Sequence, residues 1–204
     1  MERNQETGCT AFAGTACVAA GPLGAVVLQV KTAGHDGTGI LLFDDATGRP
    51  IDVDWRGTPE EAAARIGPAP TPEVAAPRGP GRPKLGVVAR EVTLLPRHWT
   101  WLSGQPGGAS VALRKLVEQR MRETAGQDKA RLAAEAAYRF MTAVAGDLPD
   151  YEEATRALFG GRGGDFAARI VDWPQDVRDY AVRLASPAFI EESGARRTEA
   201  LAGK

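Results

Sequence analysis

One segment, residues 67–83, most constrains how this chain can fold. It contains six prolines among seventeen residues, and most of the others are glycine or alanine. Proline lacks a backbone N–H and breaks helices and central strands. Since this composition also has little apolar surface to bury, the segment is expected to be an extended, semi-rigid linker. The chain must then fold as separate parts on either side of it.

The part before the linker, residues 1–66, has the pattern of a small α+β domain. Two short strands are expected within residues 10–20, and two more at 39–43 and 51–55. Between the two pairs, Pro22 is well placed to begin a helix, and the apolar residues after it recur at the spacing of one helical face. The order of elements is therefore ββαββ, with a further short helix before the linker.

The part after the linker is expected to contain a central unit, residues 84–125, and then an all-α region, residues 126–191. The helical pattern of the second region is clearest in apolar residues that step by four positions: Leu132, Ala136, Phe140 and Val144. Residues 192–204 are charged and are expected to form a flexible tail. The fold class predicted for the whole chain is α+β.

Charge is distributed unevenly along a chain whose net charge is only −1. Residues 78–122 carry nine lysines and arginines against two acids, Glu91 and Glu118, which gives +7. Residues 1–77 carry −5 and residues 123–204 carry −3. A basic centre between two acidic flanks indicates a polyanionic partner such as nucleic acid.

Several functional classes are not expected. No apolar run approaches 18 residues, and the first residues do not resemble a signal peptide, so no membrane span is predicted. Cys9 and Cys17 are the only cysteines, which fits a reducing, cytoplasmic location. No nucleophile–base pair emerges, so neither an enzyme nor a cofactor is predicted. The glycine-rich residues 160–164 lack the Lys-Ser/Thr of a phosphate loop, and an interhelical loop is expected there.

Four aspartates surround one predicted hairpin: Asp44, Asp45, Asp52 and Asp54. Clustered carboxylates can bind a divalent cation, because hard cations prefer oxygen ligands. The simpler interpretation is a solvent-facing strand surface with a capped turn, and no metal site is predicted. The acids are also able to dock against the basic centre of the same or another chain.

The basic centre resembles the ribbon-helix-helix DNA-binding proteins over about 35 residues. Residues 90–94 would form the ribbon strand, 96–105 the first helix and 110–124 the second, which the step Gly108-Ala109-Ser110 would introduce. The resemblance implies a homodimer in which one strand from each subunit pairs, and the two-stranded ribbon enters the major groove. Dimerisation is accordingly expected through residues 90–94 and the following helices.

The resemblance also implies particular DNA contacts. Ser110 is expected to cap the second helix, and the amides of its first turn, including that of Val111, to hold a DNA phosphate at the positive end of the helix dipole. Thr93 is a candidate for reading bases and Arg90 for positioning the ribbon. Arg114, on the second helix, is a further candidate contact.

The strand register decides which side chains meet DNA. Alternation places Val92 on the core face and Glu91 and Thr93 toward the groove. An acid at this position is unfavourable beside DNA unless it accepts a hydrogen bond from a cytosine amine. A shift of one residue would exchange the faces of Arg90 and Val92, so the alternative registers place either Glu91 or Arg90 toward DNA.

Just before this unit, Gly81-Arg82-Pro83-Lys84 resembles the core of an AT-hook. Such an arm places an arginine on an extended backbone in the narrow minor groove of A·T tracts, where the negative potential is enhanced. Pro80 stands where the usual first arginine would be, and Arg78 is a partial replacement. The candidate contacts of the arm are Arg78, Arg82 and Lys84.

Over its full length the chain also resembles a bacterial family of unknown function. The shared signatures are Phe-Asp-Asp-Ala-Thr-Gly-Arg at 43–49, Gly-Arg-Pro-Lys-Leu-Gly-Val-Val-Ala-Arg-Glu-Val-Thr-Leu-Leu-Pro-Arg-His-Trp at 81–99, and Gly-Gly-Ala-Ser-Val-Ala-Leu-Arg-Lys-Leu-Val at 107–117. This resemblance carries no activity with it.

The sequence therefore predicts a homodimeric, cytoplasmic DNA-binding protein of the transcriptional-regulator kind, with double-stranded DNA and a second copy of itself as partners. The alternative is a protein–protein interaction module, like an antitoxin or adaptor, in which the ribbon mainly dimerises and the C-terminal helices bind a protein. A third hypothesis is an N-terminal domain that senses a ligand or metal and acts on the DNA-binding centre.

Overall fold

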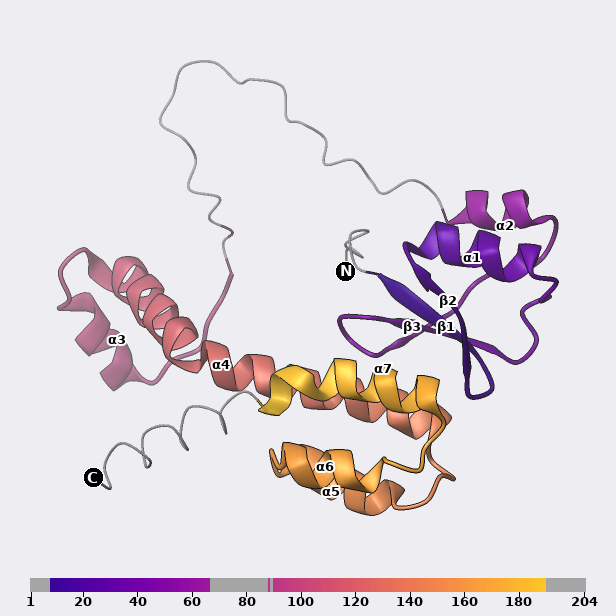
Figure 1. Ribbon diagram of the computed structural model, residues 1–204. Helices are drawn as coiled ribbons and strands as arrows, with labels where there is room; N and C mark the ends of the chain where they lie inside the picture. Colours follow the sequence, from indigo (N-terminus) through magenta and orange to yellow (C-terminus); the bar gives the residue numbers. More distant parts are fainter. Residues whose placement is uncertain (1–7, 67–87, 89, 190–204) are drawn as a thin grey trace, which may run out of the picture. The chain divides into compact units, whose positions relative to one another are not determined.

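The computed structural model describes residues 8–66, 88 and 90–189. The chain divides into two units (Figure 1): unit 1 comprises residues 1–69 and 127–204, and unit 2 comprises residues 70–126. The predicted linker at 67–83 and the predicted tail at 192–204 lie outside the described residues. Each unit is described by itself below.

Unit 1 is built on a four-stranded antiparallel sheet with the strand order β2-β1-β3-β4. The strands are β1 Cys9–Ala13, β2 Ala16–Gly21, β3 Ile40–Asp44 and β4 Pro50–Ile51. Helix α1, Leu23–Thr32, separates the two pairs of strands. This confirms the predicted α+β class and the ββαββ order, although the last strand is only two residues long where 51–55 was expected.

One face of the sheet is covered by α1 and by α2, Pro59–Arg65. Val26, Val27 and Val30 of α1 are fully buried and pack with sheet residues that include Ala11 and Leu42. These spacings are i, i+1 and i+4, so the three valines share one side of the helix.

The capping box of α2 fixes where that helix begins. Thr58 Oγ1 accepts from the Glu61 amide at 3.2 Å, and Glu61 Oε2 accepts from the Thr58 amide at 2.9 Å. Two backbone donors at the N-terminus of the helix are thereby satisfied.

The other face of the sheet packs against C-terminal helices (Figure 1). These are the end of α4 (Gly108–Val144) and α7 (Gln175–Ala185). The same core continues to α5 (Tyr151–Phe159) and α6 (Gly163–Arg169), which lie on the far side of α4 and α7, and a short 3-10 turn follows at Ser186–Phe189. At the centre, the ring of Phe140 lies 5.1 Å from those of Phe12 and Phe43 and 4.5 Å from that of Tyr180. The segments predicted at 1–66 and 126–191 therefore share one core, because aromatic residues of β1 and β3 alternate onto the face opposite α1.

The loop Asp44–Arg49 attaches the sheet to α4. Asp44 Oδ1 accepts from the amides of Ala46 and Thr47, and Arg139 of α4 donates to the Thr47 carbonyl at 2.8 Å. Gly48 has a φ of +62°, and a Cβ at this position would collide with the backbone carbonyl of Ala136. Position 48 therefore requires glycine for two reasons: its positive φ, and the close approach of its backbone to α4.

Unit 2 contains α3, Pro96–Ser103, and the first part of α4. The first helix was predicted at 96–105 and is present. The second was predicted at 110–124 but begins at Gly108 and continues without a break to Val144. Gly126 lies inside this helix; a single glycine costs only about 1 kcal/mol relative to alanine and does not end a helix whose flanking residues favour it.

Candidate nucleic-acid interface and a polar pocket

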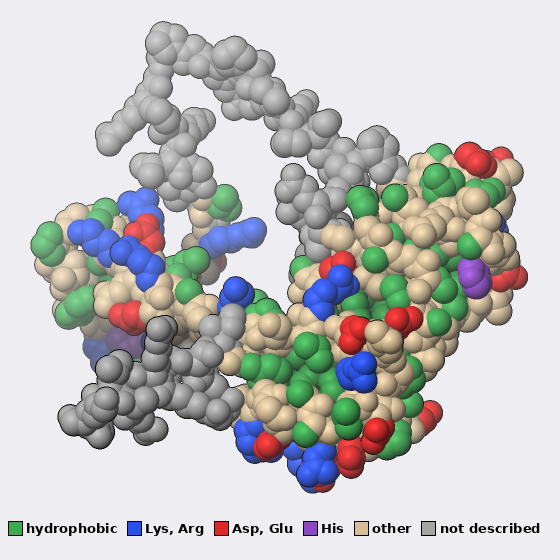
Figure 2. Space-filling view, in the orientation of Figure 1, with side chains coloured by type: hydrophobic (Ala, Val, Ile, Leu, Met, Phe, Trp, Pro, Cys, Tyr) green, Lys and Arg blue, Asp and Glu red, His purple; other side chains and the backbone are tan. Residues whose placement is uncertain are grey.

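The basic residues of unit 2 are exposed. Figure 2 shows lysine and arginine side chains gathered over α3 and the beginning of α4. The described members of this group are Arg90, Arg97, Arg114, Lys115, Arg120 and Arg122. Arg120 and Arg122 form only long ion pairs, each 3.7 Å from a glutamate of the same helix. Within the described residues the other four have no ion-pair partner, so their charge is available to a phosphate backbone.

The predicted DNA contacts fall into three groups. Arg78, Arg82 and Lys84, the candidate arm, lie outside the described residues. Arg90 and Thr93 are exposed and precede α3. Ser110, Val111 and Arg114 lie together in the first two turns of α4.

The start of α4 differs from the prediction for Ser110. The helix begins at Gly108, two residues earlier, so Ser110 is in its first turn and is not the cap. Gly107 and Gly108 have φ values of +86° and +74°, which allow the chain to turn into the helix earlier than a capping serine would. Ser110 remains exposed, while Val111 is half-buried against Gly107.

Residues 90–94 are not part of a strand in this single chain. A ribbon strand is hydrogen-bonded to its counterpart in the second subunit, and a single chain offers no such counterpart. Val92 is exposed here and Leu94 is half-buried. The ribbon therefore stays a prediction.

Unit 2 leaves most of its large apolar side chains in solvent. In its described part only Leu102 and Ala112 are buried. Eight large apolar side chains are between 41% and 72% exposed: Val88, Val92, Leu95, Trp99, Trp101, Leu116, Val117 and Met121. Exposure of this extent over so few residues is typical of a surface that is covered by a partner.

A second polar site lies in unit 1, centred on Asp45. Its Oδ1 accepts hydrogen bonds from Thr10 Oγ1 at 2.8 Å and from the Tyr180 hydroxyl at 2.9 Å. Arg183 Nη2 lies 3.1 Å from the same oxygen and 2.9 Å from Thr10 Oγ1, and its guanidinium stands 4.6 Å from the Tyr180 ring centroid. Burial, followed by the charge of Asp45, raises the pKa of Tyr180. The phenol therefore stays protonated and donates to Asp45.

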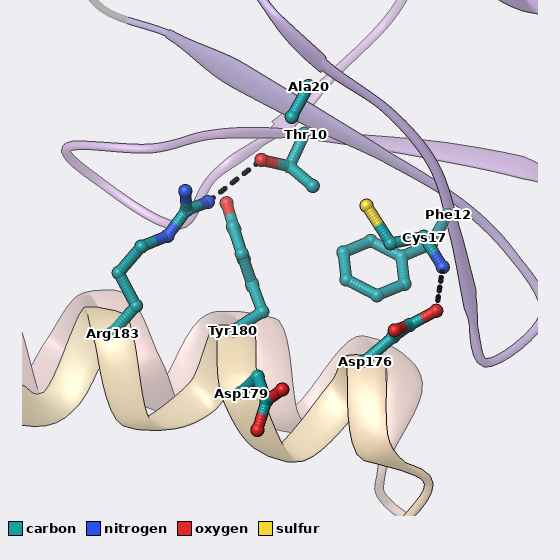
Figure 3. Close-up of a pocket in the computed structure, with 8 residues that line it drawn as sticks. All are labelled: Thr10, Phe12, Cys17, Ala20, Asp176, Asp179, Tyr180 and Arg183. Carbon is teal, nitrogen blue, oxygen red and sulfur yellow. Dashed lines mark hydrogen bonds between the residues drawn. The ribbon is translucent and has the colours of Figure 1, made fainter.

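A pocket of about 220 Å³ opens beside this network (Figure 3). The hairpin β1–β2 contributes Thr10, Phe12, Cys17 and Ala20, and α7 contributes Asp176, Asp179, Tyr180 and Arg183. At one end the Cys17 amide donates to Asp176 Oδ2 at 2.8 Å. Burial, then the charge of Asp176, raises the pKa of the Cys17 thiol. This thiol is not an activated nucleophile.

Three of the four hairpin aspartates have separate roles. Asp44 caps the loop as expected, but Asp45 is half-buried in the network above instead of facing solvent. Asp54 pairs with Arg56 at 2.7 Å, and Arg56 lowers its pKa. Within the described ranges no three potential ligands are grouped as a metal site, and no helix there is long and apolar enough to cross a bilayer.

No sequence pattern indicates this pocket, because its parts are far apart in the chain. Asp45 and Tyr180 are separated by 135 positions, and no motif links them. The one available signal was the signature at 43–49, which contains both Asp45 and the loop that contacts α4.

Comparison with known proteins places the chain in a family without supplying an activity. Residues 8–185 match the family described as an uncharacterized protein conserved in bacteria, DUF2239. No curated protein and no solved structure matches the chain. Because the match covers most of the 204 residues, the chain belongs to the DUF2239 family.

Proposed function

We propose that this protein is a homodimeric DNA-binding protein of the bacterial transcriptional-regulator kind, acting in the cytoplasm. The observation that carries the proposal is the combination found in residues 78–122: a charge of +7 together with exposed apolar residues that the unit leaves uncovered. Charge supplies affinity for phosphates, and the apolar residues supply a reason to dimerise.

The proposed dimer would cover the apolar side chains of unit 2. Pairing of residues 90–94 with the same residues of a second copy would satisfy backbone groups that have no ladder partner in one chain. It would also bring Val92 of the two copies together, with Val117 and Met121 along α4 available to the same interface. An isologous contact of this kind closes as a two-fold dimer.

The proposed DNA contacts are those expected for residues 84–125, adjusted to the observed start of α4. Thr93 or Arg90 would face bases, according to register, and the first turn of α4 would receive a phosphate through the amides that have no intrahelical acceptor, including that of Ser110. Because the helix begins at Gly108, the Val111 amide lies beyond them. Arg114 lies one turn further and would contact the backbone. Arg78, Arg82 and Lys84 would add minor-groove contacts from the preceding arm.

A salt titration tests this function. The full chain is titrated into fluorescently labelled duplex DNA by anisotropy, at several salt concentrations and with one A·T-rich and one G·C-rich duplex. Affinity should fall steeply as salt rises, because bound counterions are released. Preference for the A·T-rich duplex would support the arm. Absence of binding even at low salt would reject the proposal.

The same exposed apolar residues favour one competing function, a protein–protein interaction module. In that case Trp99, Trp101 and their neighbours would be covered by a different protein, with the ribbon serving to dimerise. Size-exclusion chromatography with light scattering separates the two. A homodimer that binds DNA supports the first function, whereas a stoichiometric complex with another protein and negligible DNA affinity supports the second.

A further inference from the structure

The polar pocket of unit 1 has one end that the Asp45 network leaves free. That end is Asp176, in the first turn of α7. Its Oδ2 accepts from the Cys17 amide at 2.8 Å, and no lysine or arginine within the described part of the chain forms an ion pair with it. Asp176 thus presents an uncompensated carboxylate at the pocket, a favourable place for a cation.

The opposite end is Arg183, on the same helix. Its Nη2 is engaged by Asp45 and Thr10. The Nε and Nη1 atoms of Arg183 have no hydrogen-bond acceptor among the described residues, and the Arg183 side chain is 52% exposed. These nitrogens remain available to donate to a carboxylate or hydroxyl oxygen of a bound molecule.

The middle of the pocket is apolar. Figure 3 shows the rings of Phe12 and Tyr180 between the two polar ends, with the Cys17 side chain facing the same hollow and Asp179 turned away from the hairpin. Phe12 is fully buried and Tyr180 nearly so, and this keeps the floor of the pocket rigid. The rings of Phe12 and Tyr180 would contact a short aliphatic chain of a bound molecule.

The spacing along α7 limits the length of the occupant. Asp176 and Arg183 are seven residues apart, which is about 10 Å along a helix axis. Their side chains therefore stand at opposite ends of the pocket, and a ligand that contacts both must carry its two charged groups several bonds apart. The volume of about 220 Å³ also restricts the site to a small molecule.

We propose that this pocket binds a small amino-carboxylate of the ω-amino-acid type, with its ammonium group on Asp176 and its carboxylate on Arg183. An α-amino acid places its two charges too close together to reach both ends. Simple amines reach Asp176 alone, and simple carboxylates meet only a guanidinium already paired with Asp45. The proposal does not depend on DNA binding and can hold or fail separately from it.

The chain offers a direct reporter of this site. It has only two cysteines, so protein labelled with ¹⁵N-cysteine gives two backbone amide signals. The Cys17 amide donates to Asp176, whereas Cys9 is buried in β1 and is an internal reference. The Cys17→Ala variant identifies the signals. 4-Aminobutyrate is titrated as the probe, with butylamine and butyrate as matched compounds that each lack one charged group.

The expected result is a saturable shift of the Cys17 signal by 4-aminobutyrate, with a dissociation constant of about 1 mM, as for a small ligand in an open site. The Cys9 signal should stay in place. Butylamine, which lacks the contact with Arg183, should bind about tenfold more weakly. Butyrate should have no effect, because it lacks the ammonium contact with Asp176 and its carboxylate meets only a guanidinium already paired with Asp45.

Substitutions show whether the shift of the Cys17 signal arises from binding between Asp176 and Arg183. Asp176→Asn keeps an oxygen for the Cys17 amide but removes the charge, so 4-aminobutyrate should no longer shift the signal. Arg183→Lys should weaken binding several-fold. Asp172→Asn is the matched control, since this exposed acid precedes α7 and does not line the pocket, and it should bind normally. No saturable shift at up to about 50 mM probe, fifty times the expected constant, would overturn the proposal, as would equal shifts in Asp176→Asn.

Discussion

Units 1 and 2 differ in how they treat large apolar side chains. Unit 1 has helices on both faces of its sheet, and Phe12, Phe43 and Phe140 are among its largest fully buried side chains. The described part of unit 2 buries only Leu102 and Ala112 and leaves eight large apolar side chains exposed. Unit 1 therefore has a hydrophobic core of its own, whereas most large apolar side chains of unit 2 would become buried only against a partner.

Charge separates the units in the same way. The arginines of unit 1 are largely engaged, as Arg183 is with Asp45 and Arg139 is with Glu135 and the Thr47 carbonyl. Those of unit 2 have at most long contacts along their own helix. The arginines of unit 1 therefore hold elements together, whereas the basic and apolar residues of unit 2 are available for partners. Five substitutions test this contrast, in order of decreasing effect.

The largest effect is expected from Phe140→Ala in the core of unit 1. Removing a buried aromatic side chain should lower the free energy of unfolding by about 3–5 kcal/mol. Met121→Ala in unit 2, where the side chain is 64% exposed, should cost well under 1 kcal/mol in the monomer. Urea denaturation followed by circular dichroism, at low protein concentration, measures both. Equal losses would show that the two units are not different in this respect.

Gly48→Ala should have the next largest effect, because it disturbs the contact between sheet and α4. The added methyl group would meet the Ala136 carbonyl, and the backbone would keep an unfavourable positive φ. We expect a loss of about 2–3 kcal/mol in unfolding free energy. Gly14→Ala is the matched control, since Gly14 has a similar φ of +59° with nothing close to it. It should therefore cost only the conformational part, about 1 kcal/mol.

Local patterns of the sequence predicted much of unit 1. The order ββαββ followed from alternating and helical spacings and from turn residues, all of which act over a few positions. The length of α4 did not, because the resemblance to ribbon-helix-helix proteins ended the second helix at residue 124, whereas the helix continues through Gly126 to Val144. The shared core of residues 12, 43 and 140 was also missed, since contacts between segments a hundred positions apart leave no local pattern.

The candidate sites differ in predictability for the same reason. The basic centre is contiguous in sequence, so its charge was visible at once, and the structure adds the exposure of its side chains. The Asp45 network draws Thr10, Tyr180 and Arg183 from two ends of the chain. From the sequence Asp45 was read as a solvent-facing acid, because nothing beside it in the chain shows that a tyrosine and an arginine will cover it.

Val117→Asp tests whether the exposed apolar residues of unit 2 form a dimer interface. In the proposed dimer a charge at this position would be buried without a partner, and the dimerisation constant should weaken at least about tenfold, or 1.4 kcal/mol. The monomer should be unaffected, because Val117 is 55% exposed there. Sedimentation velocity over a range of concentrations gives the constant. Leu132→Asp, on an exposed position of α4 in unit 1, is the control and should leave it unchanged.

Arg114→Ala tests the charge of unit 2 more finely. Loss of one phosphate contact should weaken DNA affinity several-fold and reduce the slope of log affinity against log salt by about 1. Arg156→Ala removes an exposed arginine of α5 in unit 1 that is paired with Glu153 at 2.6 Å, and it should change neither quantity. Anisotropy titrations at four salt concentrations supply both numbers. An equal change in the two variants would mean that only net charge matters and that the basic centre has no special role.

The smallest effect is expected from Asp54→Asn, which removes an exposed ion pair of unit 1. Arg56 donates to the Asp54 carboxylate at 2.8 and 2.7 Å and lowers its pKa. A carboxyl group whose pKa is lower in the folded state contributes stability above its unfolded pKa, near 4, and loses it as the pH falls further. The wild-type melting temperature should therefore exceed that of Asp54→Asn slightly at pH 6, and the two should converge toward pH 2.

Arg56→Gln should behave like Asp54→Asn, and the double variant should add nothing, since both remove the same exposed contact. If this pair proved as costly as Phe140→Ala, surface arginines would contribute to unit 1 as much as its core does, and the contrast drawn between the units would need a different basis.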